Sequence, residues 1–420
     1  MLSKGWARLF PIGAVLAGLA AAGAWSIRVG WADYRIRQKT IAGMEGAIAL
    51  TPDDAEYSAR LAPLISDDDP QKAKEALQHA VSLNPFDARS WIDLGLRAEK
   101  EGDNATATEC LLRAAGRDKE FLPRWTLANY YFRHDDRARF WFWAKEAVAM
   151  VYGDAQPMFR LCGRVEENGT LIDRLEIRNP DVRAGYLSYL LSRNRVDLAG
   201  PAVHRLLEDN RETDVPLLLT ACERFLDATR VDEAVDLWKR LAEAKRVPFE
   251  APMAKGGQLL TNGSFTTPPT SRGFDWRLSG AEGIGVSREG ESRGLRITFS
   301  GSEPEDCEAL VQLVPVRGKM QYELQFEYRT QGIAAGAGLE WRITGVGDGA
   351  ILTEGPSLAS EVDAERRILF ETPAECRLVR LALQCHRAPG TTRMEGFLVL
   401  QNVALQSAAQ APAEGGRVGK

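Results

Sequence analysis

Residues 91–115 read WIDLGLRAEKEGDNATATECLLRAA, and this stretch decides the fold of the first half of the chain. Small residues such as Gly95 and Ala107 allow the two helices of a hairpin to cross closely. Large residues such as Leu111 fill the groove that the next hairpin leaves. The stretch therefore predicts one helical hairpin of a stacked array.

Large residues recur at a constant spacing on both sides of this hairpin. Tyr57, Trp91 and Trp125 are 34 residues apart (91 − 57 and 125 − 91). Further along, Tyr186 and Leu218 begin weaker copies that are 32 residues apart (218 − 186). A fixed period in this range predicts repeated supersecondary units that bury their apolar faces against one another.

On this period and these large and small positions, residues from about 40 to 245 resemble tetratricopeptide-repeat proteins. The resemblance implies a right-handed solenoid with a concave face that binds a peptide or protein partner. The repeat pattern itself describes packing and does not specify the ligand. We expect this helical solenoid to occupy residues 28–250, with residues 150–180 as its least regular unit.

Residues 124–148 are unusually aromatic, with eight aromatic residues between positions 125 and 143. An amphipathic helix needs only about half of its circumference to be apolar. Four consecutive aromatic residues must point around most of the helix, so at least one is expected at a groove or surface. The cluster is interpreted either as a thick core or as a partner-binding surface. The candidate partner-binding residues are Trp125, Phe140, Trp141, Phe142 and Trp143.

Residues 9–27 form an uncharged apolar segment that follows a short tail, residues 1–8. Nineteen helical residues span roughly 28 Å, close to the ~30 Å hydrocarbon core of a bilayer. A cleaved secretory signal is the main alternative, since Ala22-Gly23-Ala24 fits a cleavage site. A buried helix of a soluble protein is the third interpretation. Trp25 and Trp31 suit a membrane interface and favour a transmembrane anchor.

The orientation of this anchor is harder to predict. Basic residues after the segment outnumber those before it, which by the positive-inside rule favours a cytoplasmic body. Short tails that precede a signal-like segment usually stay inside, however, and long domains cross despite their charge. We therefore expect a single-pass protein of the inner (plasma) membrane with its body on the periplasmic side.

The chain changes character after residues 251–258, which are predicted to be a linker. Seven stretches that follow alternate or run apolar over five to nine residues, with Gly, Pro, Asn or Asp between them. Such short strands without intervening helices predict an antiparallel β-sandwich over residues 259–406. Residues 407–420 have no apolar period and are predicted to be a disordered tail. The fold class is therefore multidomain, α plus β.

The start and end of this region resemble known sandwiches. Residues 262–265 (NGSF), 274–276 (FDW) and 397–405 (FLVLQNVAL) resemble the jelly-roll, galactose-binding-like domains of carbohydrate-binding modules. The resemblance implies the fold and, in some members, a sugar ligand. Related sandwiches often hold calcium through an acid that precedes Asn in the last strand. Gln401 stands there, so no metal site is expected.

A sugar site needs exposed aromatic rings that stack on the apolar faces of pyranoses. By strand alternation, Trp341 and the aromatic residues of 320–332 are expected in the core. Trp276 follows a loop and is the best candidate for an exposed ring. Phe274 and Trp276 are therefore the candidate glycan-binding residues.

Six cysteines are present, and none belongs to a CxxC pair. The three in the helical part are expected to be small buried hydrophobes. Cys376 and Cys385 lie too far apart on one predicted strand to bond each other. In an oxidising compartment Cys307 could reach one of these two, and the sequence leaves open which one.

The sequence contains no constellation typical of an enzyme. It lacks a nucleophile elbow, a phosphate-binding loop, a dinucleotide fingerprint and an HExxH motif. His134-Asp135-Asp136 is interpreted as a polar turn and not as a metal site. With a net charge of −5 and no basic stripe, nucleic-acid binding is not expected. We expect no catalytic residue and no cofactor.

The predicted function is a non-enzymatic, membrane-anchored scaffold that binds protein partners through the solenoid. The combination of an N-terminal apolar segment, divergent repeats and this sandwich resembles bacterial proteins of exopolysaccharide or O-antigen assembly and export. The alternative is a glycan-binding protein in which the sandwich is the active module, and a hydrolase is the third hypothesis.

Overall fold

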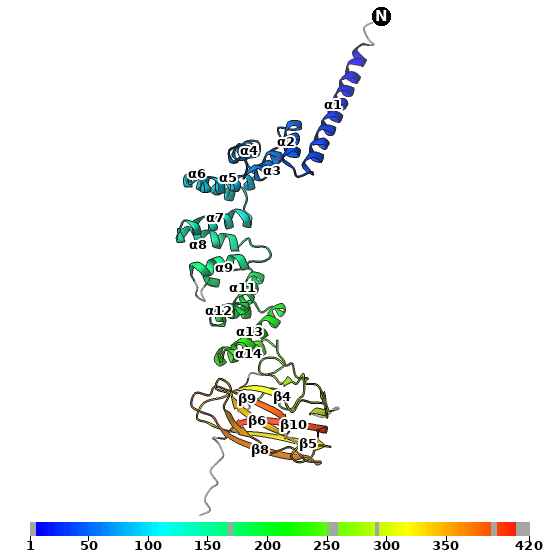
Figure 1. The fold of residues 1–420 in the computed structure, drawn as a ribbon, viewed down its shortest axis with the longest axis vertical. Coiled ribbons are helices and arrows are strands. Elements are labelled where there is room, and N and C mark those ends of the chain that lie inside the picture. Colours follow the sequence, from blue (N-terminus) through cyan, green and yellow to red (C-terminus); the bar gives the residue numbers. More distant parts are fainter. Residues whose placement is uncertain are drawn as a thin grey trace, which may run out of the picture. The chain divides into compact units, whose positions relative to one another are not determined.

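The computed structural model describes residues 6–166, 171–249, 252, 259–289, 294–387 and 393–408. Helices precede strands throughout, which confirms the predicted α plus β class (Figure 1). The predicted linker, except Pro252, and the predicted tail beyond Ala408 lie outside the described residues. The helices are α1 Trp6–Ile36, α2 Ile41–Leu50, α3 Ala55–Ile65, α4 Pro70–Leu83, α5 Ala88–Lys100, α6 Asn104–Arg117, α7 Phe121–Arg133, α8 Arg137–Val148, α9 Gln156–Val165, α10 Leu171–Arg174, α11 Pro180–Ser192, α12 Ala199–Asp209, α13 Val215–Asp227 and α14 Val231–Glu243.

The chain forms two compact units. The first comprises Met1–Glu167 and Asp173–Asn179, and the second comprises Asn168–Ile172 and Pro180–Lys420. The division falls inside the helical part, so that α11–α14 belong to the same unit as the strands. The domain boundary predicted at residue 259 stays a prediction.

Helix α1 begins inside the predicted tail and continues beyond the predicted membrane segment. Its stretch Ala14–Ile36 has a mean hydropathy of 1.3, and none of its most apolar window is buried. That length and composition are shared by membrane spans and signal sequences. The end of α1 belongs to the protein core, because Ala32 and Ile36 are buried in one cluster with Met44 of α2.

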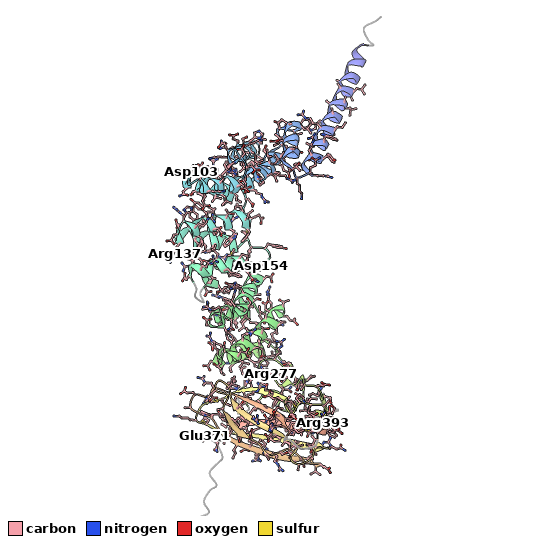
Figure 2. The ribbon with its side chains drawn as sticks, in the orientation of Figure 1. Asp103, Arg137, Asp154, Arg277, Glu371 and Arg393 are labelled. Atoms are coloured by element: carbon pink, nitrogen blue, oxygen red, sulfur yellow. The ribbon has the colours of Figure 1, made fainter. Side chains whose placement is uncertain are left out.

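Consecutive helices of the first unit pair as hairpins, α3 with α4, α5 with α6 and α7 with α8. In the α5–α6 hairpin, a Cβ added to Gly95 would lie 2.8 Å from Leu111, which confirms that a small residue is needed at this crossing. Among the helices whose first turn is described with its cap, five start at an aspartate whose carboxylate accepts a backbone N–H of that turn. These capping residues are Asp54, Asp69, Asp87, Asp103 (Figure 2) and Asp136.

In the second unit, helices α13 and α14 pack directly on the loop that precedes the first strand. The ring of Trp238 meets that of Phe274 edge-on at 5.9 Å between centroids. Gly273 has a φ of +54°, and a Cβ there would lie 2.2 Å from the Trp238 ring. Glu223 accepts hydrogen bonds from the Gly273 N–H and, at 2.7 Å, from Arg277. These contacts join the last helical hairpin to the sandwich.

The strands form two five-stranded antiparallel sheets, in the orders β1-β4-β9-β6-β7 and β2-β3-β10-β5-β8. Consecutive strands alternate between the two sheets from β3 to β6 and from β7 to β10, as in a jelly roll. The seven predicted strands correspond to β3–β6 and β8–β10. The strands are β1 Arg277–Leu278, β2 Ile284–Arg288, β3 Leu295–Ser300, β4 Asp306–Pro315, β5 Gln321–Gln331, β6 Leu339–Gly345, β7 Ile351–Glu354, β8 Ala364–Glu371, β9 Leu378–His386 and β10 Glu395–Ser407.

The core of the sandwich lies between the inner faces of the sheets. In β5, Tyr322, Leu324, Phe326 and Tyr328 are all buried, while the residues between them are partly or fully exposed. Trp341 of β6 is also fully buried, with its ring 5.8 Å from that of Phe326. The predicted strand alternation is confirmed at these positions.

Candidate functional site

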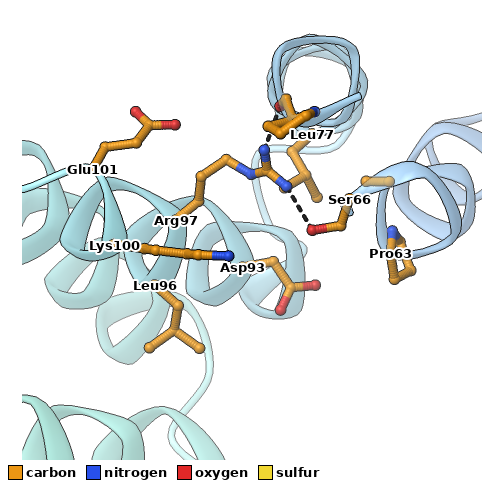
Figure 3. Close-up of a pocket in the computed structure, with 10 residues that line it drawn as sticks. Pro63, Ser66, Leu77, Asp93, Leu96, Arg97, Lys100 and Glu101 are labelled. Carbon is orange, nitrogen blue, oxygen red and sulfur yellow. Dashed lines mark hydrogen bonds between the residues drawn. The ribbon is translucent and has the colours of Figure 1, made fainter. Parts of the chain in front are cut away.

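A groove of about 460 Å³ lies between α3, α4 and α5 of the first unit (Figure 3). Its walls combine charged side chains from α5 with apolar side chains from all three helices. The lining residues are Ala62, Pro63, Ser66, Pro70, Leu77, Asp93, Leu96, Arg97, Lys100 and Glu101.

Two of the charged groups in the groove are fixed by contacts within the protein. Arg97 reaches across from α5, where it donates to Ser66 Oγ at 2.8 Å and to the Pro70 carbonyl (Figure 3). Glu101 accepts from Lys74 Nζ at 2.7 Å. These contacts connect α5 with the C-terminal end of α3 and with α4.

Two other charged groups are not committed in this way. Among the described residues, neither the Asp93 carboxylate nor the Lys100 ammonium group has a hydrogen-bond or ion-pair partner within the protein. Asp93 is half-buried, and desolvation raises the pKa of its carboxyl group, with a smaller opposing effect from Arg89. The charged form of Asp93 is therefore poorly solvated and would be stabilised by a cation from a ligand.

Sequence reasoning missed these groove residues, although a signal was present. Asp93, Leu96, Arg97 and Lys100 follow the i, i+3, i+4, i+7 spacing of one helix face. The packing positions of the same helix, such as Gly95, were predictable because the repeat pattern specifies them. The pattern leaves the groove face unspecified, so only the packing of α3 and α4 beside it identifies the face as a site.

The predicted aromatic cluster is distributed around α7 and α8, as four consecutive aromatic residues require. Phe140 is 1% exposed and Phe142 is 57% exposed. Trp141 is half-buried beneath the Arg174 guanidinium at 4.2 Å, and Trp143 is half-buried edge-on to Phe142. Trp125 is half-buried against Phe121, at 6.0 Å between ring centroids. Of the five candidates, Phe142 is thus the one that presents most of its ring to solvent.

The predicted glycan-binding residues lie in the protein interior. Trp276 is 0% exposed and Phe274 is 1% exposed. The Trp276 ring packs 5.6 Å from Phe265 and 6.1 Å from Trp341, and its Nε1 donates to the Asn262 carbonyl at 3.1 Å. The two candidate glycan-binding rings are therefore not available to a ligand, because the loop is closed by the sheet on one side and by α14 on the other.

Between these two rings, the fully buried carboxylate of Asp275 organises the loop. It accepts from the Thr270 backbone N–H at 2.5 Å, the Thr270 hydroxyl at 2.8 Å, the Trp276 N–H at 2.8 Å and the Asn262 amide at 3.4 Å. Burial raises the pKa of Asp275, while these hydrogen bonds act in the opposite direction. Asp275 therefore has a structural role, since its oxygens are occupied by the loop itself.

Among the described residues, no three His, Cys, Asp or Glu side chains come together as a candidate metal site. In the predicted polar turn, Asp136 caps α8 and His134 Nε2 lies 3.1 Å from Glu99.

No protein-family model matches the chain, and no curated protein is similar to it in sequence. Among solved structures, a crystal structure of MamA is 15% identical, with 40% of this chain and 90% of MamA covered and a TM-score of 0.29. A CBM4 structure is 12% identical, covering 35% of this chain and 97% of its own, with a TM-score of 0.29. TmCBM61 in complex with β-1,4-galactotriose is 16% identical, covering 36% and 98%, with a TM-score of 0.26. Similarities of this size assign no function to the chain.

Proposed function

We propose that this protein is a non-enzymatic adaptor, anchored in a membrane by residues 9–27, whose helical hairpins bind a protein partner. The observation that carries the proposal is the groove between α3, α4 and α5. One face of α5 presents a half-buried carboxylate, an ammonium group and an apolar side chain there, and neither charged group has a hydrogen-bond or ion-pair partner among the described residues.

The chemistry of the groove indicates what kind of segment it binds. Asp93 favours a lysine or arginine of the partner, because a cation there compensates the lost solvation of the carboxylate. Lys100 favours a carboxylate at the other end of the same face. Leu96, which is 38% exposed, and the neighbouring Pro63 offer apolar contact between the two charges. The fitting ligand is a peptide segment with an apolar residue between a basic and an acidic one.

The proposal extends to the cellular context through the architecture of the chain. An apolar N-terminal segment, helical repeats and a jelly roll are combined in bacterial proteins of exopolysaccharide or O-antigen assembly and export, which supports an envelope role by analogy. The proposed location is the plasma membrane, with the body on the periplasmic side. A reporter enzyme fused after residue 256 tests this, and activity of a cytoplasm-dependent reporter alone would contradict it.

Photo-cross-linking in native membranes tests the groove itself. A photoreactive amino acid replaces Leu96 in the full-length chain, and Leu112 of α6, which is 44% exposed, serves as the matched control position. We expect discrete adducts from position 96 that are absent from position 112. Asp93→Asn and Lys100→Ala should each weaken these adducts several-fold. Equal labelling at both positions, or labelling that neither substitution changes, would contradict binding in the groove.

The glycan-binding alternative loses its two candidate rings, because Phe274 and Trp276 are buried. On the outer face of the second sheet, the partly exposed ring of Phe397 is covered by the Arg296 guanidinium at 3.6 Å. A glycan array probed with the full-length protein distinguishes the two functions. Saturable glycan binding without adducts at position 96 would replace the adaptor proposal, and turnover of a polysaccharide would contradict its non-enzymatic part.

A further inference from the structure

Cys307 and Cys385 face each other on neighbouring strands of the sandwich. They are direct register partners in the antiparallel pair β4–β9, although 78 residues separate them along the chain (385 − 307). Opposite residues in such a pair have Cα atoms about 4.5–5.5 Å apart. This distance lies within the range of about 4.4–6.8 Å that disulfides bridge. Both residues are free thiols, and each affects the pKa of the other, as expected of neighbouring side chains.

The other cysteine of the sandwich lies at the opposite end of the same strand. Cys376 precedes β9, and its thiol donates to the Leu378 carbonyl at 3.5 Å. Leu378 is the register partner of Pro315, at the far end of β4 from Cys307. Seven residue steps of strand, from Leu378 to Cys385, cover about 23 Å, well beyond the reach of a disulfide.

The cysteine pair continues a series of cross-strand pairs at this end of β4 and β9. Arg387 donates to Glu305 at 2.6 Å, and His386 pairs with Asp306. These two pairs connect exposed or partly exposed side chains, whereas Cys385 is 3% exposed and belongs to the core. Cys307 is partly exposed. A reagent in solution therefore reaches Cys307 first.

We propose that Cys307 and Cys385 form a disulfide when the protein meets a disulfide oxidant such as oxidised glutathione, while Cys376 stays a thiol. The Cys307 thiolate attacks one sulfur of oxidised glutathione, which forms a mixed disulfide and releases one reduced glutathione. Cys385 then loses its proton and attacks the Cys307 sulfur, which releases the second. The two protein thiols lose two electrons and two protons in total, and one oxidised glutathione becomes two reduced ones.

Burial sets the rate of this exchange in the folded protein. Desolvation raises the pKa of both thiols, so the reactive thiolates are scarce at neutral pH. The reaction in the native state is therefore slow. Oxidation during folding, before Cys385 enters the core, is the faster route.

The bond would join two strands whose contact is distant along the chain. Such a link restricts the unfolded chain and raises the stability of the folded sandwich. The effect is confined to oxidising surroundings, which extracytoplasmic compartments provide. The inference rests on strand register and does not depend on the proposed adaptor function.

The full-length protein in detergent is equilibrated with a series of glutathione redox buffers, alkylated and digested without reduction. We expect mass spectrometry to find the Cys307 and Cys385 peptides linked, 2 Da lighter than their sum, with Cys376 alkylated. The oxidised protein should also melt several degrees above the reduced protein. Cys376→Ser should keep both the link and the shift, and Cys307→Ser should lose both.

Two outcomes would overturn the inference. One is alkylation of both Cys307 and Cys385 at the most oxidising ratio, after oxidative refolding as well as in the native state. The other is a link from Cys307 to Cys376. Refolding in the presence of oxidant starts from a chain in which Cys385 is exposed. It therefore distinguishes a disulfide that forms slowly in the native state from one that cannot form.

Discussion

The chain contains two aromatic-rich segments of similar composition that end in opposite environments. In α7 and α8 the aromatic residues point to all sides of each helix. The exposed fraction of their side chains ranges from 1% for Phe140 to 57% for Phe142. In the loop before β1, Phe265, Phe274 and Trp276 are each at most 1% exposed. A helix in a hairpin has an outer side, so a run of aromatics cannot all be covered. A loop enclosed between a sheet and a helix pair has no outer side for these rings.

The largest expected effect is the loss of a ring from the enclosed loop. Trp276→Ala removes a fully buried indole and should cost about 3–5 kcal/mol of unfolding free energy. Phe142→Ala is the matched change in the helical cluster and should stay within about 0.5 kcal/mol. Denaturant unfolding followed by near-ultraviolet circular dichroism measures both. If both substitutions lowered the unfolding free energy equally, the rings of the loop would not be better enclosed than those of the helical cluster.

The second effect concerns the contact that closes this loop. Gly273→Ala should cost about 1–3 kcal/mol, because a methyl group meets the Trp238 ring and the residue has a positive φ. Intrinsic tryptophan fluorescence should change with it, since the Trp238 ring is displaced. Gly280→Ala is the control, because nothing lies within 4 Å of a Cβ there. If both variants unfold at the same denaturant concentration, the contact between Trp238 of α14 and Gly273 does not contribute to stability.

Two carboxylates, one in the enclosed loop and one in the helical part, give further tests with smaller expected effects on stability. Asp275→Asn places an amide N–H where the loop donates hydrogen bonds, and should cost about 1–3 kcal/mol at neutral pH. Thermal unfolding of this variant and of wild type measures the difference. A variant as stable as wild type would mean that the loop does not depend on the carboxylate.

Asp93→Asn should have the smallest effect on stability and carry a pH signature. Burial raises the folded-state pKa of Asp93, so its ionisation opposes folding. Below the ordinary carboxyl pKa the variant and wild type should be equally stable. As pH rises through the window between that value and the raised one, wild type should lose stability relative to the variant, by less than about 0.5 kcal/mol. Stability curves between pH 3 and 8 check the sign, and a wild type that gains stability over this window would contradict it.

Most of the fold could be predicted from local patterns. Glycine at position 95 and a 34-residue period suffice to place the α5–α6 hairpin, because both packing partners lie within one repeat. Alternation in β5 suffices to assign its inner face. Three short strands were not predicted, namely β1, β2 and β7. Two to five residues carry too little periodicity for a strand to be recognised.

The candidate sites were less accessible to the same reasoning. Trp276 was the best candidate for an exposed ring because it follows a loop, and only the packing of Phe265 and Trp341 around it shows that it is buried. The groove residues Asp93 and Lys100 lay on a helix face that the repeat pattern leaves unspecified. Their role depends on which neighbouring helices face them.

The sequence by itself determined that helical hairpins precede a sandwich, the order of its seven longer strands, the hairpin crossing at Gly95 and the inward faces of those strands. Each depends on residues close together in the chain, where periodicity reports directly which side is buried. Only the tertiary structure decided that Trp276 is enclosed, that Asp93 lines a groove and that Cys307 faces Cys385 and not Cys376. These depend on the register between distant segments, which the burial of many side chains fixes jointly and no local pattern records.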